Sequence, residues 1–360
     1  MRDQHAGTAG PEHGHRPGGR TAPAHQGVPP DRPHGVRPIR PRTRALAAAL
    51  VGLSVAACGC TGSPGAASAA PGAAPGPAAA PATQVPQAAR ERPETAGATE
   101  TARRDPALPA PGEAIPKDPV RLARALTGTA ERLRQAIDDW RREGNPAEGR
   151  APEPVALLAL YQQRVYRYLA RHPETAARTY ARLPKAVAGP AKADVTAIRK
   201  LLTLVHPVSR PARFRVKEPE PADVLLGHFR HAERRFGVEW EVLAAVMLVE
   251  TKFGRVRSPS HTGAKGPMQF MPRTWEAYGM GGDVHDTRDA VLGAANYLHA
   301  SGAPRNYRRA LYAYNHSWAY VDAVLLHARQ MKRDIRNYYA YYNWQVFVVT
   351  TRGERRLTGP

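Results

Sequence analysis

The large apolar residues of this chain are unevenly distributed along its 360 residues. Residues 1–118 consist mostly of proline, alanine, glycine and arginine, with almost no aromatic or large aliphatic side chain. Such a segment cannot bury enough apolar surface to offset the conformational entropy lost on folding. The sequence therefore confines the folded part to roughly residues 119–360, which is long enough for a helical domain and a second, smaller unit.

A short apolar run, residues 45–57, interrupts this N-terminal segment. Its thirteen residues are too few to span a bilayer as a helix, but they match the apolar centre of a signal peptide, and arginines precede them. The run ends just before Cys58, in the manner of a bacterial lipobox, in which the cysteine becomes diacylated. We expect residues 1–57 to be a signal peptide with a long basic N-terminal region and Cys58 to be lipidated. Cleavage without lipidation is the alternative.

Residues 58–118 are rich in proline and alanine, which predicts a disordered linker. Over residues 119–206 apolar side chains recur mostly at steps of three to four, which predicts three helical segments. Pro184, Gly189 and Pro190 are expected to separate these segments. We interpret residues 119–206 as a helical accessory region.

A second helical region is predicted over residues 222–335, after a spacer dense in proline and charge. Residues 336–360 begin with a cluster of tyrosines and continue with a β-rich segment. This pattern predicts an aromatic tail and a small β-hairpin that turns at Arg352-Gly353. The fold class we expect is therefore mainly α, with a C-terminal hairpin.

The net charge of +21 points to anionic surroundings, such as a cell wall or a membrane surface. No nucleic-acid-binding signature accompanies the charge, so we expect no nucleic-acid partner. The two cysteines, Cys58 and Cys60, lie outside the foldable region, and the histidines lack the paired spacing of a metal site. We therefore expect no metal ion and no other cofactor. The oligomeric state stays open.

Glu250 directly follows an uninterrupted apolar run, residues 242–249. On a helix, the residues three, four and seven positions earlier share its face, and here they are Met247, Val246 and Leu243. Burial on such a face disfavours the charged carboxylate and raises its pKa. A carboxyl that stays protonated near neutral pH can act as a general acid. The alternative is a helix-end glutamate that points into solvent.

Some reactions that begin with a general acid also need a second carboxylate. The candidates are Asp283, Asp286 and Asp289, which follow a glycine pair. Their spacing lacks the final glutamate of an EF-hand calcium loop. We therefore expect them to form a turn and to cap the helix that begins near Ala290.

Two sequence blocks follow Glu250. The first runs Ser260-His261-Thr262-Gly263-Ala264-Lys265-Gly266-Pro267-Met268-Gln269, and the second runs Ala313-Tyr314-Asn315-His316-Ser317. Together with Glu250 and in this order, they resemble the soluble lytic transglycosylase domain, a goose-lysozyme-like family filed as glycoside hydrolase family 23. The resemblance covers about residues 222–335. The chain departs from the family pattern at Thr251, Pro267 and Ser317, where serine, leucine and glycine are usual.

The resemblance implies an exported, lipid-anchored enzyme of the actinobacterial type that cleaves the glycan strands of peptidoglycan. In such an enzyme one glutamate protonates the glycosidic oxygen and then takes a proton from the 6-hydroxyl of the sugar, which leaves a 1,6-anhydro end. Glu250 matches this position. The candidate substrate-binding residues are Ser260, Met268, Gln269, Tyr314, Asn315 and Tyr320. Two alternatives stay open: a lysozyme-type muramidase, which hydrolyses the bond, and a non-catalytic peptidoglycan-binding lipoprotein.

Side-chain chemistry refines some of these expectations. Gly263 and Gly266 can adopt positive φ and let the backbone approach a sugar. The Gln269 amide can both donate and accept hydrogen bonds. Met268 is expected to form an apolar wall of the site, whereas Met271 is expected to pack in the core. Tyr314 and Asn315 are expected to orient an N-acetyl group, although Asn315 also suits the N-cap of the next helix.

Overall fold

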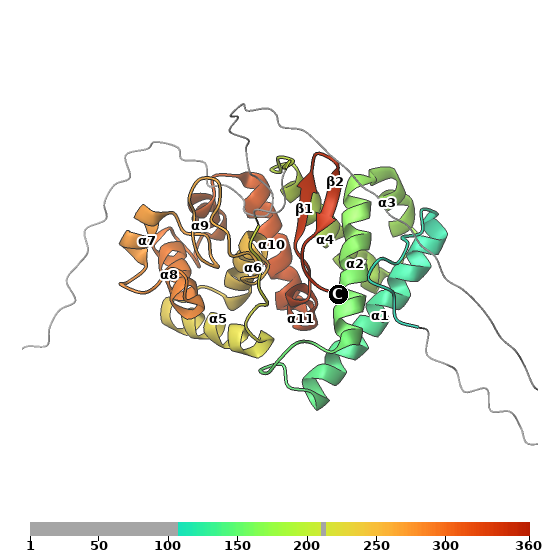
Figure 1. The fold of residues 1–360 in the computed structure, drawn as a ribbon, viewed down its shortest axis with the longest axis horizontal. Helices are drawn as coiled ribbons and strands as arrows, with labels where there is room; N and C mark the ends of the chain where they lie inside the picture. The colour runs from blue at the N-terminus through green and yellow to red at the C-terminus, as the bar shows by residue number, and fades with distance from the viewer. Residues whose placement is uncertain (1–106, 210–213) are drawn as a thin grey trace, which may run out of the picture. The chain divides into compact units, whose positions relative to one another are not determined.

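The computed structural model describes residues 107–209 and 214–360. These residues form eleven helices and one antiparallel two-stranded sheet (Figure 1), which confirms the expected mainly α class with a C-terminal hairpin. In chain order the elements are α1 (Pro119–Glu143), α2 (Glu153–Arg171), α3 (Pro173–Tyr180), α4 (Lys185–Leu202), α5 (Ala222–Phe236), α6 (Trp240–Thr251), α7 (Pro272–Tyr278), α8 (Thr287–Ala300), α9 (Tyr307–Tyr314), α10 (Trp318–Arg333), α11 (Arg336–Tyr342), β1 (Phe347–Thr350) and β2 (Gly353–Arg356). The predicted signal peptide, Cys58 and residues 58–106 of the predicted linker lie outside the described residues.

The region expected to hold three helical segments forms four helices, α1 to α4. Asp118 caps α1, because its carboxylate accepts a 2.8 Å hydrogen bond from the backbone N–H of Arg121. Gly189 and Pro190 lie inside α4, so the prediction that they separate helices is wrong. A proline inside a helix costs about 3 kcal/mol. The packing of α4 against α2 and α10 offsets that cost.

Helix α6 lies in the middle of the fold. It is apolar all round, and every residue from Glu241 to Thr251 is buried, as expected for a helix that other elements enclose on all sides. It contacts α5, α8, α10 and α11. Helix α10 packs against both α6 and α4 (Figure 1), so it joins the N-terminal helices to the centre of the fold.

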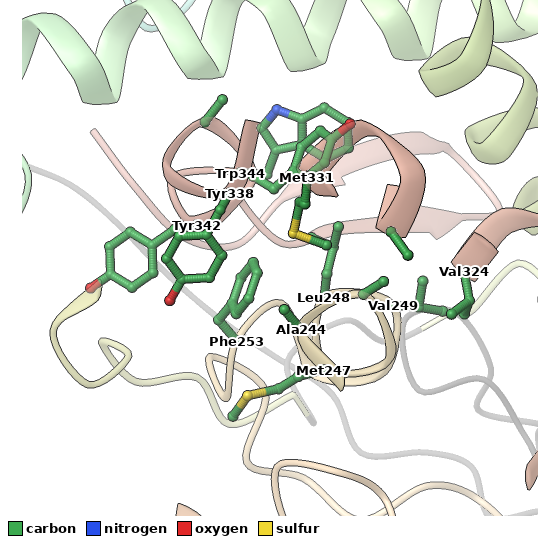
Figure 2. Packing of buried hydrophobic residues seen from close by; sticks show 14 of the residues in the cluster. Ala244, Met247, Leu248, Val249, Phe253, Val324, Met331, Tyr338, Tyr342 and Trp344 are labelled. Atoms are coloured by element: carbon green, nitrogen blue, oxygen red, sulfur yellow. The ribbon is translucent and has the colours of Figure 1, made fainter. Parts of the chain in front are cut away.

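The tyrosine cluster expected to form a tail is a helix, α11, and all residues from Tyr338 to Tyr342 are buried. The Tyr338 hydroxyl donates to the Ala222 carbonyl at 2.7 Å, and the Tyr342 hydroxyl donates to the Glu220 carbonyl at 2.9 Å. Figure 2 shows both rings beside Phe253 at the end of α6. The cluster is therefore part of the core and not an exposed sugar-stacking surface.

A single hydrophobic core extends from α1 to Trp344. The Trp140 ring of α1 meets the Tyr339 ring of α11 edge to face, with 5.6 Å between centroids. On the other side of α11, the Gln163 amide exchanges two hydrogen bonds with the backbone of Gln345, at 2.8 and 2.9 Å. Residues 119–206 thus share their core with the region that contains Glu250.

The hairpin and the spacer form a smaller second cluster. Strand β1 pairs with β2 in antiparallel register, and Thr350 lies opposite Gly353. Val208 bonds to the backbone of the hairpin, and Val216 pairs with Val256, just beyond α6. The described residues of the spacer therefore connect the hairpin to the segment that follows Glu250.

Candidate active site

Glu250 is the penultimate residue of α6, and its side chain is 3% exposed. Met247, Val246 and Leu243, which share its helix face, are buried as well. Burial raises the pKa of Glu250 from its ordinary value of 4.5 to about 8, although the Tyr320 hydroxyl and the Lys252 ammonium group each lower it. The carboxyl is therefore mostly protonated at pH 7.

The backbone turns sharply after Glu250. Lys252 and Phe253 both have positive φ, 53° and 58°, which is uncommon for residues other than glycine. Thr251 holds this turn in place, because its hydroxyl donates to the Pro267 carbonyl at 2.6 Å and accepts from the Gly254 N–H at 2.9 Å. The hydroxyl retained at this position thus joins the end of α6 to the loop before Gln269.

That loop is a tight structure of residues 258–270. The Ser260 hydroxyl accepts from the Ala264 N–H at 2.8 Å and shares a hydrogen bond with the Thr262 hydroxyl, so it stabilises the turn itself. Gly263 and Gly266 both have positive φ. A Cβ on Gly266 would collide with the Val284 carbonyl oxygen. The absence of a side chain at Gly266 therefore lets this loop lie directly against the backbone of Val284.

Gln269 lies at the end of the loop with a positive φ of 53°. Its amide nitrogen donates to the Gly266 carbonyl at 2.9 Å, which fixes the orientation of the amide. The amide oxygen is buried and has no hydrogen-bond partner. Because nearly all buried polar atoms in folded proteins are paired, this oxygen is a candidate acceptor for a substrate group.

Tyr320, from the first turn of α10, contributes a second such atom. Its side chain is fully buried, and its hydroxyl finds no partner with ordinary hydrogen-bond geometry. The hydroxyl is nevertheless close enough to Glu250 to lower the pKa of that carboxyl. In turn, burial and the nearby Glu250 charge raise the pKa of Tyr320 well above its usual value.

Tyr314 and Asn315 end α9 beside this group. The Tyr314 hydroxyl donates to the Met268 carbonyl at 2.6 Å, which ties α9 to the loop. Asn315 is 3% exposed, and its backbone N–H donates to the Leu311 carbonyl. It is not the N-cap of α10: that position belongs to Ser317, whose hydroxyl accepts from the Tyr320 N–H at 3.3 Å.

Met268 and Met271 differ in burial. The Met268 side chain is fully buried in the core, whereas Met271 is only half-buried and precedes α7. The expectation that Met271 packs in the core is therefore wrong, and the role of Met268 as a wall of the site stays a prediction. The predicted site thus divides into two groups. Glu250 and Tyr320 lie close to one another, Gln269 has an unpaired amide oxygen on the adjoining loop, and Asn315 is buried next to Tyr314. Ser260, Met268 and Tyr314 hold the surrounding backbone.

The three aspartates at the start of α8, with Asp289 in its first turn, have the predicted turn and cap roles. Asp286 caps α8 by accepting from the Asp289 N–H at 2.9 Å, and Asp283 accepts from the His285 N–H at 2.8 Å. Asp289 in turn accepts from the Asp283 N–H. The described residues contain no group of three or more side chains suited to holding a metal ion.

Sequence reasoning missed Lys252. Burial, and after it the charge of Arg167, lower its pKa from 10.5 to about 7, against the opposing effect of Glu250. Its side chain lines a cavity of about 50 Å³ beneath α6, between α4 and the hairpin. The only available signal was its position two residues after Glu250.

None of the described helices combines the length and the apolar character needed to cross a bilayer.

Residues 227–336 match the protein family described as Transglycosylase SLT domain. A membrane-bound lytic murein transglycosylase F of Thiobacillus denitrificans is 32% identical over 82 residues, which are 23% of this chain and 17% of that protein. The chain thus spans less than a fifth of that relative's length. No solved structure gives a significant match. Residues 227–336, which carry Glu250 and the polar groups described above, therefore match the transglycosylase SLT domain family.

Proposed function

We propose that this protein is a murein lytic transglycosylase of the goose-lysozyme-like type, glycoside hydrolase family 23. Its substrate would be the β-1,4 bond between N-acetylmuramic acid and N-acetylglucosamine, and its product a 1,6-anhydro-N-acetylmuramic acid end. The observation that carries the proposal is the state of Glu250. It is a buried carboxyl with a pKa of about 8, and no carboxylate of the described residues is among the groups that shift it.

A lone acid favours a transglycosylase over a hydrolase that needs two carboxylates about 5–9.5 Å apart. In the proposed reaction Glu250 gives its proton to the glycosidic oxygen, which leaves with the electron pair of the C1–O bond. The 2-N-acetyl group of the muramic acid residue stabilises the cation that develops at C1. The Glu250 carboxylate then takes the proton of the 6-hydroxyl while that oxygen bonds to C1, so the ring closes without water and Glu250 is again protonated.

The unpaired groups around Glu250 support this assignment because they match the substrate's chemistry. The Gln269 amide oxygen would accept from a sugar hydroxyl or an acetamido N–H, and the Asn315 amide can donate and accept at an N-acetyl group. The Tyr320 hydroxyl would stabilise the carboxylate after proton transfer. Ser260 and Tyr314 would support the binding loop without contacting sugar, and Met268 would form an apolar wall.

Mass spectrometry of the muropeptides released from purified sacculi tests the proposal. We expect 1,6-anhydro ends from the wild-type protein and a loss of two to four orders of magnitude in rate, roughly, in Glu250→Gln. Glu241→Gln is the matched control, because Glu241 is also buried on α6 and its pKa is also raised by burial. Its activity should stay within about twofold of the wild type.

The two alternatives give different results in the same experiment. Reducing ends would assign the protein as a muramidase. Binding to sacculi with no soluble product, unchanged by Glu250→Gln, would assign it as a non-catalytic binding protein.

We further propose that the protein acts outside the cytoplasmic membrane and is anchored by a lipid on Cys58. The support is the sequence before Cys58, which lies outside the described residues. Metabolic labelling with a fatty-acid analogue tests it. Label in the wild-type protein but not in Cys58→Ala supports the anchor, and an unlabelled secreted protein contradicts it.

A further inference from the structure

A cavity of about 370 Å³ lies among α1, α2, α4 and the junction of α10 and α11. None of the predicted site residues lines it. Small-molecule sites in proteins have volumes of about 300–1,000 Å³ and often lie between packed helices. The cavity is therefore large enough for a small ligand, and the side chains around it indicate which kind.

Two buried polar side chains of α2 line this cavity. Gln162 is 9% exposed and Tyr166 is 2% exposed, and they lie one helical turn apart on the same face. Among the described residues, neither the Gln162 amide nor the Tyr166 hydroxyl has a hydrogen-bond partner. Because buried polar groups in folded proteins are nearly always paired, these two groups are candidate contacts for a ligand.

The uncompensated charge at the cavity is positive. Arg134 of α1 is half-buried, and within the described part of the chain it has neither an ion pair nor a hydrogen bond. Arg333 and Arg336 line the cavity from the α10–α11 junction, and of these Arg336 already pairs with two aspartates. A guanidinium group matches the geometry of a carboxylate and can bind it with two hydrogen bonds. The cavity therefore favours a ligand with a carboxylate.

Helix α4 contributes hydrogen-bond acceptors. Ala186, Pro190 and Asp194 all line the cavity, and their spacing of four residues places them on one face of α4. Pro190 has no backbone N–H, so the Ala186 carbonyl lacks its usual helical donor. The buried Asp194 carboxylate accepts from the Tyr341 hydroxyl at 2.5 Å and has further acceptor capacity. This wall therefore suits an N–H group of a ligand.

The remaining wall is apolar. Leu133 and Ile137 of α1 and Val187 of α4 line it, and each is buried. An aliphatic side chain of a ligand would lose contact with water against these residues, which favours binding.

We propose that this cavity binds a small molecule with a free carboxylate, an amide N–H and a short aliphatic side chain, which is the chemistry of an acylated amino acid or of the C-terminal end of a peptide. Arg134 pairs with the carboxylate, and the acceptors of α4 bind the N–H. Gln162 and Tyr166 gain the partners that the protein does not give them. This inference goes beyond the proposed function and does not depend on it.

The cavity is also separate from Glu250 in space. Tyr320, which lies close to Glu250, is in the first turn of α10, and Arg333 is the last residue of the same helix. At 1.5 Å per residue, these two positions are about 20 Å apart along the helix axis. Variants in the cavity therefore leave the residues around Glu250 unchanged.

A ligand-observed NMR titration of the full chain with N-acetylalanine tests the proposal. N-acetylalaninamide, in which a neutral amide replaces the carboxylate, is the matched control ligand. We expect saturable binding of the acid and an affinity about tenfold lower for the amide, because a hydrogen bond to a charged group is lost. Absence of saturable binding, or equal affinities for the acid and the amide, overturns the proposal.

Variants locate the binding in this cavity. Arg134→Met should weaken the binding of N-acetylalanine about tenfold and remove the preference for the acid over the amide. Tyr166→Phe should weaken it about threefold to tenfold, and the variant should fold normally because the hydroxyl has no partner among the described residues. Arg124→Met, an exposed arginine of α1 outside the cavity, should match the wild type. Wild-type affinity in folded Arg134→Met and Tyr166→Phe overturns the site.

Two further comparisons identify the occupant and keep the two proposals apart. Tighter binding of N-acetylalanyl-alanine than of N-acetylalanine supports a peptide end as the occupant, and weaker binding supports a free acylated amino acid. Glu250→Gln should bind both probes like the wild type. A protein that binds the probes but does not cleave sacculi contradicts only the proposed function, and one that cleaves sacculi but does not bind them contradicts only this inference.

Discussion

The Thr251 hydroxyl donates a 2.6 Å hydrogen bond to the Pro267 carbonyl, and this bond connects the two segments that build the site. One segment is the end of α6 with Glu250, and the other is the loop with Gln269. Thr251 and Pro267 are sixteen positions apart in the sequence. The backbone just after Glu250 is strained, and this hydrogen bond holds it in place. Thr251 itself is fully buried.

Thr251→Val should therefore reduce both stability and activity. The change keeps the shape of the side chain but leaves the Pro267 carbonyl and the Gly254 N–H without their partner. We expect the free energy of unfolding to decrease by about 2 kcal/mol or more, as measured by denaturant titration. Thr251→Ser retains the hydroxyl and should stay much closer to the wild type. Equal losses in both variants would contradict the role of the hydrogen bond.

Glu250→Gln should stabilise the folded protein in a pH-dependent way. Since the folded-state pKa is raised from 4.5 to about 8, the folded protein binds more protons than the unfolded chain between these values. The stability of the wild type should decrease as pH rises through this window, by about 3 kcal/mol at pH 7. Glutamine has no such cost. The advantage of the variant should thus be present at pH 8 and absent near pH 4; a constant advantage would argue against the raised pKa.

Tyr320→Phe should lower activity with little effect on stability, because the hydroxyl it removes makes no hydrogen bond of ordinary geometry with the described residues. We expect kcat to fall about 10- to 100-fold, because this hydroxyl would donate to the Glu250 carboxylate that forms after proton transfer. The alkaline limb of kcat/KM should move to higher pH, because the Tyr320 hydroxyl lowers the pKa of Glu250. A pH–rate series with unfolding measurements on the same samples checks both points.

Tyr341→Phe should lower the stability of the protein and leave the pH dependence of its activity unchanged. The Tyr341 hydroxyl donates to buried Asp194 of α4 at 2.5 Å, and neither residue is among the groups that shift the pKa of Glu250. Removing it leaves a buried carboxylate with one hydrogen bond fewer, so the free energy of unfolding should fall by about 1–3 kcal/mol. The pH dependence of kcat/KM should not move. A shifted profile here would mean that the Tyr320 result reports general loosening of the core.

Gly266→Ala should destabilise the protein, because the new Cβ would meet the Val284 carbonyl and the positive φ of 73° disfavours alanine. We expect a loss of about 2 kcal/mol or more in thermal unfolding. Gly227→Ala on α5 is the matched control. Nothing lies within 4 Å of its added Cβ, and alanine is the better helix former, so this change should be neutral or stabilising.

The helices and the position of Glu250 were predictable because they depend on local periodicity. The apolar run before Glu250 is long enough that any helix through it must place the carboxyl among hydrocarbon side chains. The N-cap at Asp286 and the hairpin turn near Gly353 were equally local signals. In each case the residues that decide the structure are neighbours in the sequence.

The parts that sequence reasoning missed depend on distant partners. The tyrosines of α11 looked like a tail because the groups that accept their hydroxyl hydrogen bonds, such as Ala222 and Asp194, lie far away in the chain. Lys252 was missed because the residues that line the cavity around it come from α2, α4 and the hairpin. Pro190 looked like a boundary because its cost is visible in the sequence and the packing that offsets it is not.

The single core has a practical consequence for anyone who wishes to use the SLT domain by itself. The borders of the family match, 227 and 336, would cut off α1 to α4 and most of α11. A fragment with those ends would expose the apolar sides of α6 and α10 to water and would be prone to aggregate. The smallest fragment that we expect to fold by itself therefore begins at α1, and a fusion partner should be attached before α1.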